Sequence, residues 1–79
     1  MMVLYYINFN GTIKELDEWK KMAKEHWEKV KGVKLVGIYT PSIAWNTAIL
    51  LETDSLDKIL SNQGGRSDKV RNTDMVVLF

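Results

Sequence analysis

Apolar residues recur along the chain with two spacings, one typical of strands and the other typical of helices. Residues 3–9 are rich in β-branched and aromatic side chains, and they predict a first strand. Apolar side chains then recur every three or four residues, which predicts a helix over residues 13–31 with one apolar face. Thr12 and Glu15 have the spacing of a capping box at the start of this helix, and Gly32 is its expected stop.

The second half of the chain predicts a second helix and three further strands. Asp54 is the expected N-cap of that short helix, and Gly64-Gly65 is its expected end. In chain order, the expected elements are strands at 33–39 and 43–52, a helix at 55–62, a charged loop at 66–73 and a strand at 74–79.

The order strand, helix, strand, strand, helix, strand predicts an α+β fold of the ferredoxin-like kind. Right-handed crossovers then place both helices on one face of a four-stranded antiparallel sheet. The chain has 79 residues, which fits a single domain over residues 1–79.

The predicted strands carry apolar side chains on both faces, although an antiparallel sheet with one wet face should alternate apolar and polar residues. In the first strand, Tyr5 and Ile7 point to one face, whereas Leu4 and Tyr6 point to the other. Two short helices cover only one face, so the other would expose more apolar surface than a monomer normally does. We therefore expect a symmetric homodimer in which two sheets pack face to face.

Composition argues against several classes of function. The formal net charge is only +1, from 11 basic and 10 acidic residues, which argues against a nucleic-acid partner although RNA-recognition domains share this element order. A chain with no cysteine and one histidine offers little for a metal site. No apolar run is long enough to span a membrane and no signal peptide is recognisable, so we expect a cytoplasmic protein without a membrane partner.

Two stretches of sequence, Gly32–Thr40 and Ala48–Asp54, add to the element order and the two-sided sheet as points of similarity to a known family. In the second stretch, the strand ends in Glu52 before the short helix. With these features the chain resembles the dimeric α/β-barrel superfamily, and in particular its small uncharacterised members. The superfamily includes monooxygenases, haem-degrading enzymes, isomerases and ligand-sensing domains, so the resemblance implies a fold and a dimer rather than one chemistry.

His26 is the only histidine and the one candidate for a catalytic residue. It lies beside the apolar face of the first helix, towards the sheet. In the superfamily the pocket often lies between helices and sheet, so the resemblance implies that His26 contacts a ligand or acts as an acid and base there. The alternative is a histidine at the edge of the core that hydrogen-bonds a backbone carbonyl.

Tyr6 and Asn8 are candidates for ligand binding because they share one face of the first strand. A buried amide at Asn8 would need a hydrogen-bond partner, which a ligand oxygen could provide. The alternative is that Asn8 lies at the strand end and faces water.

Trp45 and Asn46, in the third predicted strand, are candidates of the same kind, together with Trp19 on the first helix. A tight turn at residues 41–42 would place Asn46 on one face with three small residues, Gly37, Ala44 and Ala48. Small side chains there would leave room beneath Trp19 and Trp27. That room is either a ligand pocket or the space that the large helix residues fill.

Two hypotheses for the function result. The first is a homodimeric protein that binds a small aromatic or apolar molecule between helices and sheet, without a cofactor. The alternative is a cofactor-independent monooxygenase or isomerase acting on an aromatic substrate, in which His26, Tyr6, Asn8 and the tryptophans converge near one cleft. Haem chemistry is disfavoured because the haem-degrading enzymes of the superfamily carry a histidine on the second helix, where this chain has none.

Overall fold

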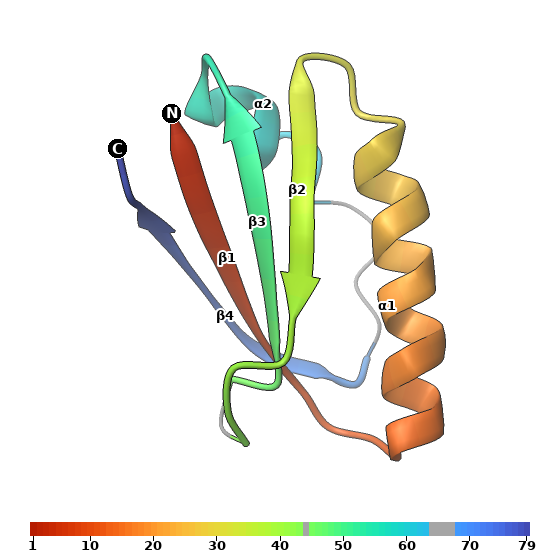
Figure 1. The fold of residues 1–79 in the computed structure, drawn as a ribbon. Helices are drawn as coiled ribbons and strands as arrows, with labels where there is room; N and C mark the ends of the chain where they lie inside the picture. Colours follow the sequence, from red (N-terminus) through yellow and green to blue (C-terminus); the bar gives the residue numbers. More distant parts are fainter. Residues whose placement is uncertain (44, 64–67) are drawn as a thin grey trace.

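A computed structural model describes residues 1–43, 45–63 and 68–79 of the chain. Within these ranges, the elements are β1 (Met2–Phe9), α1 (Ile13–Glu28), β2 (Val33–Tyr39), β3 (Thr47–Thr53), α2 (Leu56–Leu60) and β4 (Val70–Val77). The strands form one antiparallel sheet in the order β2-β3-β1-β4, and α1 runs alongside β2 (Figure 1). The predicted ferredoxin-like α+β fold is therefore confirmed.

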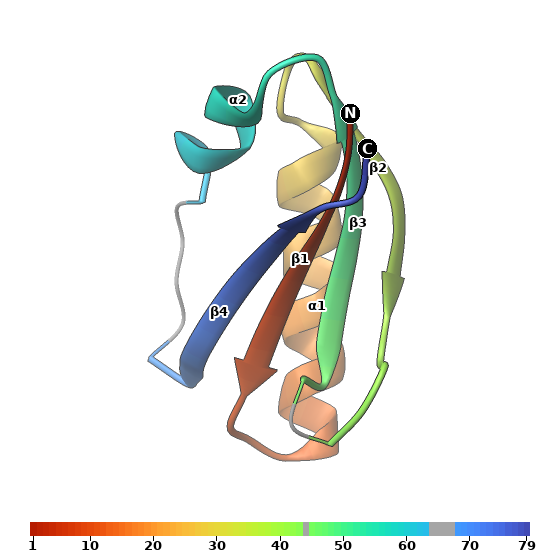
Figure 2. The same cartoon turned by 90° about the vertical axis from the view of Figure 1, so that its left-hand side faces the viewer.

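The core lies between the helices and one face of the sheet. Every second side chain of β1 is buried on this face, and so are Ile49 and Leu51 of β3. Trp27 of α1 and Ile59 of α2 belong to the same buried cluster, so both helices cover the same face. The second view shows α1 behind the sheet and α2 to the left of its upper part (Figure 2).

The opposite face of the sheet, called the open face below, has an apolar centre. Leu4 of β1 pairs with Leu50 of β3 on one side and with Val76 of β4 on the other. The register places thirteen residues on the open face, namely Met2, Leu4, Tyr6 and Asn8 of β1, Lys34, Gly37 and Tyr39 of β2, Ala48, Leu50 and Glu52 of β3, and Asn72, Asp74 and Val76 of β4.

The start of α1 agrees with the prediction, but its end does not. The backbone N–H of Glu15 donates to Thr12 Oγ1 at 3.1 Å, and the N–H of Thr12 donates to Glu15 Oε1 at 3.0 Å, which completes the capping box. The helix ends at Glu28, three residues before the predicted position. A final tight turn follows it, and Gly32 then reverses the chain with a positive φ of 83°.

The predicted start of the third strand at residue 43 is wrong, because β3 begins at Thr47. Before that point, the chain turns back on itself: the N–H of Ser42 donates to the carbonyl of Trp45, and the N–H of Trp45 donates to Ser42 Oγ. Ala44 lies outside the described residues. Ile43, Trp45 and Asn46 therefore precede the strand, although two of these three side chains are apolar.

The predicted cap of α2 is also wrong. Ser55 occupies the N-cap position, and the carboxylate of Asp54 instead pairs with Lys58 at 2.8 Å. This contact lowers the pKa of Asp54 below its usual value, chiefly through the hydrogen bond from Lys58. The helix covers only five residues, and Gly64-Gly65, its predicted end, lies outside the described residues.

The last strand begins earlier than predicted, within the segment expected to be a charged loop. Asn72 pairs with Asn8, and Thr73 pairs with Ile7, so polar residues continue the ladder. Since β4 is an edge strand and half of its side chains point to the open face, its pattern is not the apolar one on which the prediction relied.

Lys69 connects the start of β4 to the first turn of α1. Its ammonium lies 2.5 Å from Glu15 Oε2, and the two side chains are 42% and 37% exposed. The pKa of Glu15 is lowered from 4.5 to about 2, chiefly by the hydrogen bond from Lys69 and then by the backbone N–H of Thr12. Water and salt screen this exposed pair, so its contribution to stability is small.

Glu15→Gln is expected to lower the stability slightly at neutral pH and to leave it unchanged below about pH 2. Glutamine can also complete a capping box, so the substitution removes mainly the charge. A carboxylate with a lowered folded pKa stabilises the fold above its unfolded pKa, near 4.5, and loses this contribution as the pH falls towards 2. Urea unfolding of both proteins across this range measures the difference, and a difference that does not change with pH contradicts the assignment.

Candidate functional site

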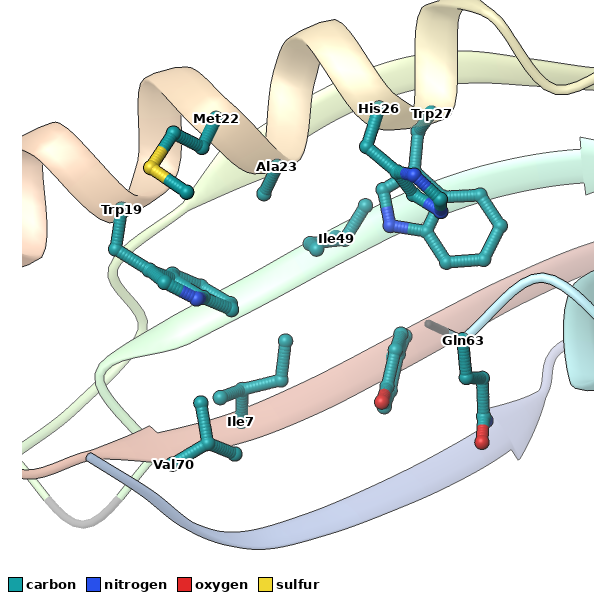
Figure 3. A pocket seen from close by; sticks show the side chains of 10 residues that line it. Ile7, Trp19, Met22, Ala23, His26, Trp27, Ile49, Gln63 and Val70 are labelled. Atoms are coloured by element: carbon teal, nitrogen blue, oxygen red, sulfur yellow. The ribbon is translucent and has the colours of Figure 1, made fainter. Parts of the chain in front are cut away.

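A cavity of about 230 Å³ lies between α1 and the core face of the sheet. Its lining residues are Trp19, Met22, Ala23, His26 and Trp27 of α1, Tyr5 and Ile7 of β1, Ile49 of β3, Gln63 and Val70. Figure 3 shows the side chains of α1 on one side of the space, with Ile7, Ile49 and Val70 opposite them. The cavity is therefore mostly apolar, with a few polar groups on its walls.

The wall that α1 contributes to the cavity results from helical spacing. Trp19, Ala23 and Trp27 are four residues apart, so they form one row on α1. The two large side chains are held by aromatic partners on β1: the Trp19 ring packs on Phe9 at 5.5 Å between centroids, and Trp27 meets Tyr5 edge-on at 6.4 Å. Ala23, between the tryptophans, leaves the space open.

His26 is fixed at one end of the cavity by a hydrogen bond. Its Nε2 lies 2.6 Å from the backbone carbonyl oxygen of Asn62, just after α2, and its ring meets Trp27 edge-on. The structure therefore shows the hydrogen bond to a backbone carbonyl that one alternative predicted, and it also places His26 on the cavity wall, while its contact with a ligand stays a prediction. Because a carbonyl oxygen only accepts, Nε2 carries the hydrogen and the neutral ring keeps an accepting lone pair on Nδ1.

The hydroxyl of Tyr5 is a second polar group of the cavity. Tyr5 is only 5% exposed, and no residue of the described chain forms a hydrogen bond with its hydroxyl. The hydroxyl oxygen is not among the fully buried unpaired atoms of the described residues, and Tyr5 lines the cavity. A buried phenol normally has a hydrogen-bond partner, so this group is suited to meet a molecule inside the cavity.

Comparison with known proteins leaves the site to be interpreted from its own geometry. No protein-family model, no curated protein and no solved structure matches the chain. The described residues form a small α+β fold with a four-stranded antiparallel sheet and two helices.

Two further properties of the described residues bear on the site. They contain no group of three or more side chains that could hold a metal ion together. Neither α1 nor α2 has the length and apolar character needed to cross a membrane.

The structure separates the predicted site residues into two groups. Trp19 and His26 line the cavity. Tyr6 and Asn8 lie on the open face, and the ring of Trp45 packs against Tyr6 with 6.1 Å between centroids. The expectation that His26, Tyr6 and Asn8 converge near one cleft is therefore wrong, because the sheet lies between them.

Asn46 is engaged with the backbone of β1. Its Oδ1 accepts from the N–H of Phe9 at 2.9 Å, and its Nδ2 donates to the carbonyl of Phe9 at 2.7 Å. The expectation of small residues beneath the tryptophans is also wrong, because Gly37 and Ala48 lie on the open face. A side chain at Gly37 would collide with the ring of Tyr39.

Several cavity residues were not predicted, and the sequence gives little sign of them. The sequence places Tyr5 on one of two apolar faces of the first strand without showing which face the helices cover, and its unpartnered hydroxyl is visible only in three dimensions. Met22 lies one position from the apolar row of α1. Gln63 and Val70 follow α2 and begin β4, so only the tertiary fold brings them to the cavity.

Proposed function

We propose that this protein binds a small molecule in the cavity between α1 and the sheet, and that it does so as a homodimer paired through the open face. The observation that carries the binding proposal is the unpartnered hydroxyl of Tyr5, a largely buried residue, in a mostly apolar cavity. Binding sites for small molecules combine apolar walls with a few such polar groups.

Rigid support for the cavity walls favours binding over a packing defect. Trp19 and Trp27 each rest on an aromatic ring of β1, and His26 is bonded to the backbone after α2. Walls fixed in this way keep the space open without a ligand, so binding would require little rearrangement.

The open face supports the homodimer. Its centre is the apolar row Leu50, Leu4 and Val76, whereas charged and amide side chains lie around that centre. An apolar centre within a polar rim is the usual anatomy of a protein interface. A second copy of the same face would cover the centre about a two-fold axis, as in the dimeric α/β-barrel superfamily, to which we infer that the chain belongs.

A panel of metabolites, tested by thermal shift and by native mass spectrometry, would examine the binding proposal. We expect at least one compound to raise the unfolding temperature of the wild type and to remain bound in the native spectrum. Ala23→Phe places a ring in the cavity and should abolish this shift, whereas Lys21→Phe places the same ring on the exposed side of α1 and should preserve it. A panel without a single stabilising compound would count against the function.

One argument for the alternative function, a monooxygenase or isomerase, does not hold in the structure. It assumed that Tyr6 and Asn8 act together with His26, but these two residues lie on the other side of the sheet. His26 has a fixed orientation that suits proton transfer, yet the structure provides no second polar residue from the original set beside it. We therefore prefer binding as the function.

A further inference from the structure

The polar groups of the cavity restrict the chemistry of its occupant, if the proposed binding function is correct. His26 donates through Nε2 to Asn62, so Nδ1 is its remaining nitrogen, and in the neutral ring this atom accepts. The bond to a backbone carbonyl also stops the ring from presenting Nε2 instead. A ligand that hydrogen-bonds to Nδ1 of the neutral ring must therefore donate the hydrogen.

Tyr5 can pair with a hydrogen-bond donor or with an acceptor, because its hydroxyl both donates and accepts. A ligand hydroxyl has the same property, so it can donate to His26 and accept from Tyr5. An ether or an aromatic hydrocarbon cannot donate, and it would leave the accepting nitrogen of His26 without a partner.

The walls indicate an uncharged molecule. None of the described residues that line the cavity is lysine, arginine, aspartate or glutamate. A carboxylate or phosphate would be moved from water into an apolar space without an opposite charge, which is strongly unfavourable. Neutral ligands avoid this loss.

Size and wall shape indicate one or two rings. An engineered apolar cavity of about 150 Å³ in another protein binds benzene, and the present cavity has about 230 Å³. Aromatic side chains stand at both ends of the row on α1, where Trp19 and Trp27 can contact the face or the edge of a planar ring.

We propose that the cavity selects uncharged aromatic molecules of one or two rings that carry an O–H or N–H group, and that Nδ1 of His26 accepts a hydrogen bond from this group. Asn62 acts as the positioning residue, because its carbonyl fixes the orientation of the His26 ring and places the hydrogen of the neutral ring on Nε2. Phenols and related hydroxylated rings are the simplest members of this class.

Isothermal titration with three matched probes tests the proposal. β-Naphthol carries the donor, its methyl ether lacks it, and β-naphthoate replaces it with a charge. We expect the wild type to bind β-naphthol about tenfold more tightly than the ether, which corresponds to ~1.4 kcal/mol, and to bind β-naphthoate most weakly. The single histidine of the chain gives a second readout, because β-naphthol should shift its Nδ1 resonance in nitrogen NMR and the ether should not.

Two variants test whether Nδ1 of His26 and the hydroxyl of Tyr5 cause the preference for β-naphthol over its ether. Phenylalanine at position 26 keeps a ring but has no atom that accepts a hydrogen bond, so His26→Phe should bring the affinity ratio of β-naphthol to ether close to one. Its affinity for the ether should remain that of the wild type, which shows that the cavity is intact. Tyr5→Phe should weaken β-naphthol more than the ether, because it removes the hydroxyl and keeps the ring.

The outcomes separate the ligand class from the function itself. Equal binding of β-naphthol and its ether, or tighter binding of β-naphthoate, overturns the proposed class. If metabolites of another chemistry still bind and Ala23→Phe still blocks them, the binding function stands without that class. If neither the probes nor the metabolite panel bind, both proposals are wrong.

Discussion

Replacing Trp27 with alanine is expected to remove a large part of the stability of this fold. Trp27 is only 3% exposed, packs edge-on against Tyr5 and belongs to the buried cluster that joins α1 to the sheet. Truncation of a buried tryptophan costs about 3–5 kcal/mol, partly because it enlarges a cavity. A domain of this length has roughly 4–12 kcal/mol in total.

Thermal unfolding followed by circular dichroism measures this loss, and we expect the midpoint to fall by roughly 15–30 °C. Met22→Ala is the control, because this side chain lies on the same helix and beside the same cavity but is largely exposed. Its midpoint should change by only a few degrees. A small effect of Trp27→Ala would mean that α1 is held to the sheet by other contacts.

Leu4→Lys is expected to convert the proposed homodimer into a monomer. Leu4 lies between Leu50 and Val76 at the centre of the open face. An ammonium group at this point would face its own symmetry-related copy in an apolar interface, where an unpaired charge is strongly unfavourable. In the separate chain, the long lysine side chain can reach water, so the fold should persist.

Native mass spectrometry tests this prediction directly. The wild type should show twice the mass of the chain, whereas Leu4→Lys should show the mass of one chain with an unchanged circular dichroism spectrum. Ile13→Lys adds the same charge at a position that is 81% exposed at the start of α1, and it should remain dimeric. A wild type that is already monomeric would remove the dimer from the proposed function.

The fold could be predicted because local signals and periodicity agree over most of the chain. The capping box at Thr12 and the alternating strand β1 report directly on local structure. The errors arose where tertiary contacts override the pattern. Apolar residues after Pro41 suggested a strand, but the side chain of Asn46 takes up the backbone groups of Phe9 before the ladder begins.

The candidate site was predictable only in part. Helical spacing placed Trp19 and His26 on the side of α1 that faces the sheet, and both line the cavity. Strand residues were harder, because a pattern that is apolar on both faces does not show which face the helices cover. Tyr6 is a candidate because it shares a face with the polar Asn8, but its neighbour Tyr5 is the residue on the cavity side.

The bulge in β2 has a consequence for aggregation. The register shifts between Leu35 and Gly37, so the outer edge of the sheet is irregular at Val36, and Lys34 adds a charge nearby. An irregular, charged edge is a poor template for another strand. This edge therefore disfavours pairing of β2 with a strand of another copy. The proposed face-to-face pairing ends with two copies, because each copy has one open face, and β2 adds no second direction of growth.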